Sequence, residues 1–181
     1  MALTSYLNVP LEYQEDDFSC VPACIKMTLE FVRQQNTTGY VPNMNIEEIS
    51  QAIGTDELGT PLQGIEKINE KLLKAVPSIE FEAKMNCTFS EIEKEIQDGR
   101  PVIAWIKTPF AHSIVVTGLN REALVLYYND PQRGKRQIEM GKFMSAWESI
   151  DNVLIKVEIG GKIQRVIPEF IEKNEHEGEK I

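Results

Sequence analysis

The chain has 181 residues, of which 42% are hydrophobic and 26% are charged, a composition typical of a folded soluble domain rather than a disordered or fibrous chain. Its net charge of −9 repels phosphate backbones, so we expect no nucleic acid among its partners. The first ten residues have neither the basic start nor the hydrophobic run of a signal peptide or membrane span, so we expect a cytoplasmic protein that does not span a membrane.

The chain begins with an extended segment and a helix. Residues 1–13 include Pro10 and are expected to be extended. From Cys20 to Gln34, hydrophobic residues recur at spacings of four and three, at Cys20, Cys24, Met27 and Phe31. This spacing predicts a helix that is buried on one side. Cys20 lies at its N-terminal end, and Pro22 falls in the first turn, where a missing N–H does no harm.

Capping signals predict two more helices in the first half of the chain. Asn45 with Glu48 three residues later forms a capping box that opens a helix through Ile53. Thr60, followed by a proline and then by a glutamine at the third helical position, is predicted to be the N-cap of a helix that runs to about Ala75.

Strands dominate the second half. Residues 78–85 alternate as a strand does, and Ser90 with Glu93 is predicted to cap a helix that ends at Gly99. A helix is also expected from Met140 to Trp147. Runs rich in β-branched and aromatic residues then predict the strands of an antiparallel sheet, at 101–106, 112–118, 123–128 and 153–159.

The order of these elements favours an α+β fold, with an N-terminal helical lobe packed on an antiparallel β-sheet lobe. Residues 1–167 are expected to form a single domain, because a chain of this length can bury a core without covalent cross-links. Residues 168–181 are acidic and poor in hydrophobic side chains, so we expect a frayed tail there.

Cys20 is the candidate nucleophile. The three cysteines are an odd number in a chain without an export signal, which favours free thiols over disulfides. A reactive thiol needs its pKa lowered by a helix N-terminus or by an imidazolium. Only two histidines are present, and His176 lies in the expected tail, so His112 is the candidate base.

Two further groups complete the expected chemistry. Asp130 follows the next strand and is predicted to orient His112, with Asn129 as the rival for that role. Gln14, six residues before Cys20, is placed to donate its amide to the oxyanion of an acyl-transfer intermediate.

These residues resemble a known family. The segment from Gln14 to Met27, Gln-Glu-Asp-Asp-Phe-Ser-Cys-Val-Pro-Ala-Cys-Ile-Lys-Met, is similar to the active-site segment of the papain-like cysteine peptidases that remove double-glycine leaders from bacteriocin precursors. Similar signals follow in the family's order, at Gly99–Ile103, His112–Gly118, Asn129–Gly134 and Phe143–Trp147. The resemblance covers about Val9 to Trp147.

The resemblance implies a papain-like fold, catalytic roles for Cys20, His112 and Asp130, and a place for Gln14 in the oxyanion hole. The best-known members are fused to membrane-spanning exporters. This chain carries no such partner domain, so we expect it to be a standalone member. It departs from the family at Ser19, usually acidic, and at Val21, usually glycine, whose larger side chain is expected to narrow the groove beside the thiol. Double-glycine specificity is therefore not carried over.

The expected function is a cysteine peptidase that acts on a peptide or protein through a Cys-His-Asp triad and a thioester, with no cofactor and no metal. One alternative is an acyltransferase or deamidase with the same triad, and another is a non-catalytic peptide-binding module. A zinc site formed by Cys20, Cys24, Cys87 and His112 has suitable ligand types but lacks the paired spacing typical of zinc sites. Cys24 is expected in the core.

Overall fold

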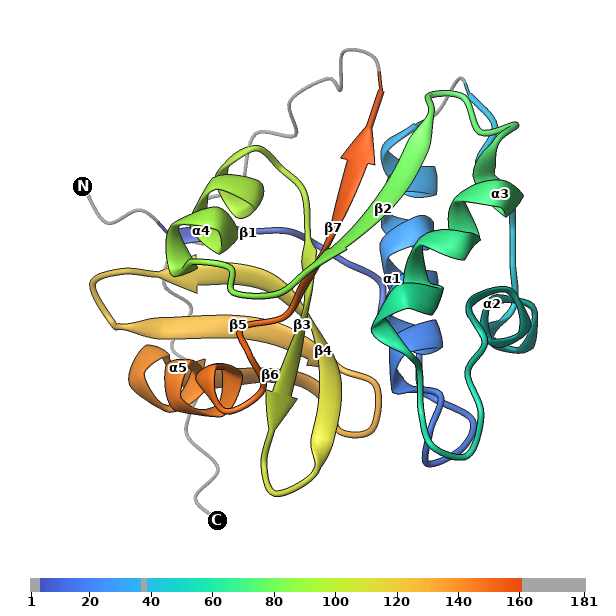
Figure 1. The fold of residues 1–181 in the computed structure, drawn as a ribbon. Helices are drawn as coiled ribbons and strands as arrows, with labels where there is room; N and C mark the ends of the chain where they lie inside the picture. Colours follow the sequence, from blue (N-terminus) through green and yellow to red (C-terminus); the bar gives the residue numbers. More distant parts are fainter. Residues whose placement is uncertain (1–3, 37–38, 161–181) are drawn as a thin grey trace.

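The computed structural model describes residues 4–36 and 39–160. A seven-stranded antiparallel sheet forms its centre, and helices lie on both sides of the central strands in Figure 1. To the right of these strands are α1 (Cys20–Gln35), α2 (Ile46–Ile53), the 3-10 helix η1 (Leu62–Lys67) and α3 (Ile68–Leu72). To the left are α4 (Phe89–Gln97) and α5 (Met140–Glu148).

The strands of the sheet run in the order β2-β7-β3-β4-β5-β6, and β1 pairs with the end of β4. Their bounds are β1 (Thr4–Tyr6), β2 (Ile79–Lys84), β3 (Val102–Lys107), β4 (Ala111–Asn120), β5 (Val125–Asp130), β6 (Gly134–Glu139) and β7 (Leu154–Ile159). At Gly118, where β1 crosses β4, a Cβ atom would lie 2.4 Å from the carbonyl oxygen of Ser5. The close approach of β1 to β4 therefore requires glycine.

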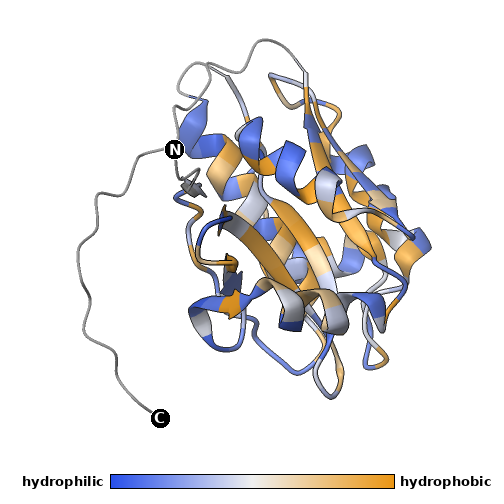
Figure 2. Ribbon diagram, turned by 90° about the vertical axis from the view of Figure 1, so that its left-hand side faces the viewer, coloured by the Kyte–Doolittle hydropathy of each residue, from blue (hydrophilic) through white to orange (hydrophobic). Residues whose placement is uncertain are grey.

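One hydrophobic cluster joins the helices to the sheet. The buried face of α1, which includes Cys24, Met27 and Phe31, packs against β4, while Phe143 and Trp147 of α5 are fully buried on β3 and β5. Hydrophobic residues are concentrated in the strands in Figure 2. The predicted α+β fold, a helical lobe packed on an antiparallel sheet, is confirmed.

The helix predicted from Cys20 and the capping box before α2 are both correct. Asn45 Oδ1 accepts the backbone N–H of Glu48, and the Glu48 carboxylate accepts that of Asn45, each at 2.8 Å. The prediction for Thr60 is wrong. The N-cap of η1 is Pro61, while the Thr60 hydroxyl lies 2.7 Å from that of Thr55 and does not cap the helix. The helical segment ends at Leu72 rather than near Ala75.

The predicted capping box at Ser90 and Glu93 is also misplaced. Thr88 is the N-cap of α4, and the Glu91 carboxylate accepts its backbone N–H at 2.8 Å. Glu93 instead accepts a 2.7 Å hydrogen bond from the guanidinium of Arg121. Both threonine–glutamate and serine–glutamate pairs match the pattern, so spacing alone does not choose between them.

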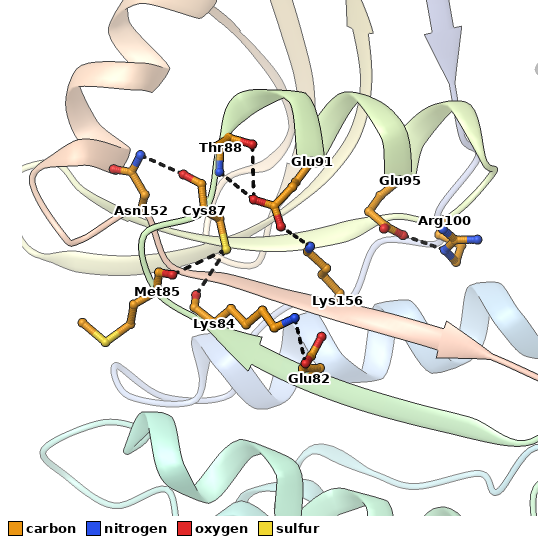
Figure 3. Close-up of polar contacts among 10 residues, drawn as sticks. All are labelled: Glu82, Lys84, Met85, Cys87, Thr88, Glu91, Glu95, Arg100, Asn152 and Lys156. Carbon is orange, nitrogen blue, oxygen red and sulfur yellow. Dashed lines mark hydrogen bonds and ion pairs between the residues drawn. The ribbon is translucent and has the colours of Figure 1, made fainter.

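Besides the pair of Glu93 with Arg121, two further ion pairs fix α4 to its surroundings, and Figure 3 shows both. Glu91 pairs with Lys156 of β7, whose side chain is largely buried. Glu95, which is buried on α4, accepts a 2.6 Å hydrogen bond from Arg100 in the segment that leads to β3. Each charge that α4 buries is therefore compensated by a partner of opposite sign.

Strand β6 was not predicted. Its residues, Gly-Lys-Arg-Gln-Ile-Glu, are half charged and mostly exposed, and among the described strands it pairs only with β5 at the edge of the sheet. Such edge strands carry little hydrophobic signal, because one side has no neighbouring strand and charged side chains suit it. The tail predicted at 168–181, with His176, lies outside the described residues.

Candidate active site

Three segments of the chain meet around the predicted site residues. They are the N-terminal end of α1, which carries Cys20, the start of β4, which carries His112, and the end of β5, which carries Asp130. Helix α1 is brought to β4 because its hydrophobic face packs against that strand. The structure therefore brings Cys20, His112 and Asp130 together from positions far apart in the sequence.

The pairing of β4 with β5 positions His112 beside Asp130. Val115 lies opposite Asn129, so the same register puts Asp130 opposite Ile114, on the face that His112 also uses. The Nε2 atom of His112 lies 2.9 Å from Oδ1 of Asp130. Both side chains are largely shielded, with 17% of the histidine and 5% of the aspartate exposed.

The turn after β5 holds the Asp130 carboxylate in place. Its Oδ1 atom accepts the backbone N–H of Gln132 at 2.8 Å and that of Arg133 at 3.2 Å. Burial raises the pKa of Asp130, but the hydrogen bond to His112 and those from the two backbone amides outweigh it, so the pKa lies below its usual value. Asp130 is therefore ionised at neutral pH and can hold a protonated imidazole.

Cys20 is half-buried at the first position of α1, where the backbone N–H groups of the first turn have no partner within the helix. Burial raises the pKa of its thiol. Its hydrogen bond to His112, the charge of that imidazole, and hydrogen bonds from the backbone and side chain of Ser113 together outweigh burial, so the pKa lies below its usual value.

The same contacts act on the imidazole in the opposite direction. Burial lowers the pKa of His112, but its hydrogen bonds to Asp130 and Cys20 and the negative charges of both partners raise it to about 9. Because Nε2 bonds to Asp130, Nδ1 is left to face the sulfur. At neutral pH this arrangement favours a thiolate beside an imidazolium.

Gln14 lies in the loop before α1 and is tied to the same region. Its backbone N–H donates to the carbonyl of Pro131, directly after Asp130, at 2.9 Å. Its side-chain Nε2 donates to the carbonyl of Asp16 at 2.5 Å, and its Oε1 is buried without a hydrogen-bond partner among the described residues. The amide nitrogen carries a second N–H that this contact does not use.

Asn129, the rival of Asp130, has a different role. Its side chain is buried and donates to the carbonyls of Val9 at 3.0 Å and Pro10 at 3.4 Å. The neighbouring position on a strand points to the opposite face, which separates Asn129 from His112. Asn129 thus anchors the extended N-terminal segment to β5.

The other two cysteines occupy different surroundings. Cys24 is fully buried in α1, and burial, together with the charges of Cys20 and Asp130, raises its pKa. Cys87 lies before α4, where its thiol contacts the carbonyls of Lys84 and Met85, and burial raises its pKa as well (Figure 3). Within residues 4–36 and 39–160, no three His, Cys, Asp or Glu side chains form a group suited to a metal ion.

The structure corrects the expectation for Val21 and explains Ser19. Only 3% of Val21 is exposed and its side chain belongs to the core, so it does not narrow a groove beside the thiol. Ser19 is buried as well, and its hydroxyl accepts backbone N–H groups of the preceding loop. Two residues of the site were not predicted from the sequence: Ser113, which lowers the pKa of Cys20, and Asp16, whose carbonyl accepts the Gln14 amide.

A family model described as the Peptidase_C39 like family matches residues 6–155. The chain belongs to this family. Family and fold are those of cysteine peptidases, as the sequence resemblance predicted. Among the described residues, no helix has the length and hydrophobicity needed to cross a bilayer.

Among curated proteins, this Peptidase_C39-like chain is similar to the lactococcin-G-processing and transport ATP-binding protein LagD of Lactococcus lactis subsp. lactis. The two are 28% identical over 140 residues, which are 76% of this chain. The match spans only 18% of the length of LagD.

Three solved structures share the fold. A putative C39-like peptidase from Bacillus anthracis aligns over 88% of this chain and 100% of its own, with a TM-score of 0.67 and 15% identity. The double-glycine-motif protease of an AMS/PCAT transporter, in complex with the leader peptide, aligns over 86% of this chain and 94% of its own, with a TM-score of 0.60 and 20% identity. The peptidase domain of Streptococcus ComA aligns over 83% of this chain and 98% of its own, with a TM-score of 0.60 and 19% identity.

Proposed function

We propose that this protein is a cysteine peptidase that hydrolyses peptide bonds through a Cys20–His112–Asp130 triad and a thioester intermediate. The observation that carries the proposal is the imidazole of His112, whose Nε2 lies 2.9 Å from Oδ1 of Asp130 and which lowers the pKa of the Cys20 thiol. Membership of the Peptidase_C39 like family gives independent support.

The reaction begins with the thiolate of Cys20. The sulfur attacks the carbonyl carbon of the scissile bond, forming an S–C bond and moving one electron pair onto the carbonyl oxygen. The side-chain amide of Gln14 and the backbone N–H of Cys20 would stabilise that oxyanion. The His112 imidazolium then protonates the amide nitrogen, the C–N bond breaks, and the amine product leaves a thioester on the enzyme.

Water completes the cycle. Neutral His112 accepts a proton from the water as its oxygen attacks the thioester carbon, and the C–S bond breaks. The acid product leaves, and the thiolate–imidazolium pair is restored. Asp130 remains ionised throughout and keeps Nδ1 of the imidazole directed at the sulfur. The steps need no cofactor.

The substrate is proposed to be a peptide or a protein. The similar AMS/PCAT protease was solved with a leader peptide bound, which supports peptide binding on this fold.

We further propose that residues 1–167 form one domain, because the two lobes share a single hydrophobic core. Three free cysteines support a reducing, cytoplasmic location.

Mass spectrometry of a defined peptide mixture incubated with the protein tests the proposal. We expect new termini from hydrolysis with the wild type, loss of cleavage in Cys20→Ala, and unchanged cleavage in Cys87→Ala, a control that removes another free thiol. If amine adducts or deamidated side chains form instead, the chemistry is acyl transfer or deamidation. If peptides bind but stay intact, the protein is a binding module.

A further inference from the structure

The segment between Gln14 and Cys20 is held by hydrogen bonds of Asp16 and of the Ser19 side chain, of which those of Asp16 reach both ends. Its carboxylate oxygen Oδ1 accepts the backbone N–H of Phe18 at 3.0 Å and that of Ser19 at 2.7 Å. Its own backbone carbonyl accepts the side-chain Nε2 of Gln14 at 2.5 Å. Asp16 therefore contacts the expected oxyanion donor on one side and the residue next to the thiol on the other.

The Ser19 side chain also forms hydrogen bonds to the backbone of this segment. Its hydroxyl accepts the backbone N–H of Asp16 at 3.3 Å and that of Glu15 at 3.2 Å, and its side chain is buried against the start of α1. Asp16 and Ser19 thus exchange side-chain to backbone hydrogen bonds in the manner of a capping box. The exchange fixes the loop conformation, so the carbonyl of Asp16 stays where the Gln14 amide can use it.

We propose that Asp16 is a positioning residue for the oxyanion hole, which it organises by holding the Gln14 amide at a fixed place relative to Cys20. This inference rests on the proposed peptidase function. An oxyanion donor stabilises the transition state only when it is already oriented, because reorientation during the reaction would consume the free energy that it supplies. The Asp16 carbonyl occupies one N–H of the amide and leaves the second for the substrate oxygen.

The adjacent residue provides a matched control. Asp17 carries the same charge and is exposed, but its carboxylate accepts no hydrogen bond among the described residues. A second variant, Asp16→Asn, keeps the Oδ1 acceptor for Phe18 and Ser19 and removes only the charge. Loss of charge and loss of geometry can therefore be measured separately.

The test compares peptide hydrolysis with alkylation of Cys20 by iodoacetamide. Alkylation needs the thiolate but forms no oxyanion, so it reports on Cys20 and on the groups that stabilise its thiolate. We expect Asp16→Ala to lower kcat roughly 10- to 100-fold, the scale of a small misplacement of a catalytic group. Gln14→Ala should lower it by about 10²- to 10³-fold. Both variants should keep the wild-type alkylation rate, and Asp16→Asn and Asp17→Ala should keep kcat.

Coupling between the two positions gives the sharper result. If Asp16 acts through Gln14, the double variant Gln14→Ala/Asp16→Ala has the same kcat as Gln14→Ala alone. The inference is overturned if the loss of kcat in the double variant equals the product of the two single losses. It is also overturned if Asp16→Ala keeps full kcat, or if its Cys20 alkylation rate falls as much as its kcat. A wild-type protein that alkylates at Cys20 but cleaves no peptide contradicts the proposed function itself, and the inference with it.

Discussion

The Nε2 atom of His112 lies 2.9 Å from Oδ1 of Asp130, although 18 positions separate the two residues in the sequence. The register between β4 and β5 produces this contact, and two backbone N–H groups of the following turn hold the carboxylate in place. The other ring nitrogen, Nδ1, is thereby left to interact with Cys20. The whole proposed mechanism depends on this orientation.

Asp130→Ala removes the group that holds His112. We expect hydrolysis to fall by roughly 10²- to 10⁴-fold, the range that a positioned acid or base supplies, because the imidazole loses both its orientation and its stabilised proton. Asn129→Ala is the matched control. It removes the donor to the buried carbonyl of Val9 and to the partly buried carbonyl of Pro10, so it should lower the free energy of unfolding by about 1–3 kcal/mol while the folded protein keeps its kcat. The opposite pattern would assign the orienting role to Asn129.

Activity should depend on pH through the two pKa shifts. The pKa of Cys20 is lowered, so its thiolate persists to lower pH than that of a free cysteine, and iodoacetamide should alkylate it fastest among the three thiols at neutral pH. The pKa of His112 is raised to about 9, so acylation should decline as pH rises through that value and the imidazolium loses the proton it gives to the leaving amine. A pH profile of kcat/KM that still rises above pH 9 would contradict this assignment.

Ser113→Ala tests a contact that supports the thiolate. The substitution removes the hydroxyl donor to Cys20 and leaves the backbone donor in place, so the pKa of Cys20 should rise and its alkylation at neutral pH should slow. Ser145→Ala on α5, whose hydroxyl donates to the carbonyl of Gly141 on the same helix, is the control and should change neither quantity. Equal alkylation rates in the two variants would exclude a role for the Ser113 hydroxyl.

The packing of α5 on the sheet can be measured separately from the chemistry. Phe143 is fully buried, with its ring stacked 5.6 Å from that of Trp147, so Phe143→Ala should lower the free energy of unfolding by about 3–5 kcal/mol. Phe110, at the tip of the β3–β4 hairpin, is 81% exposed, and its replacement by alanine should change that free energy by less than about 0.5 kcal/mol. Chemical denaturation of both variants gives the comparison.

Much of the fold could be predicted because local signals and burial agree. The four-three spacing from Cys20 found α1, and the Asn45–Glu48 capping box found the start of α2. Prediction failed where the local signal was ambiguous or weak. Two overlapping cap patterns, beginning at Thr88 and Ser90, occur at the start of α4, and the edge strand β6 had no hydrophobic alternation to reveal it.

The candidate site divides in the same way. Cys20, His112, Asp130 and Gln14 could be selected because few residue types can do the chemistry and the family resemblance ordered them. Val21 was misjudged because the sequence does not say which side of a helix start faces the core, and the structure buries it. Asp16 was overlooked because its hydrogen bonds with Ser19 lie in the loop before α1, where Asp16 and Ser19 do not match the Ser/Thr-to-Glu/Gln pattern of a capping box.

The most direct test of the central claim is labelling with a peptide that carries an electrophilic carbonyl, followed by mapping of the modified residue. The account predicts a single adduct on Cys20 in the wild type, no adduct in Cys20→Ala, and much slower labelling in His112→Ala. An adduct on Cys87, or labelling of Cys20 that proceeds equally fast without His112, would contradict it.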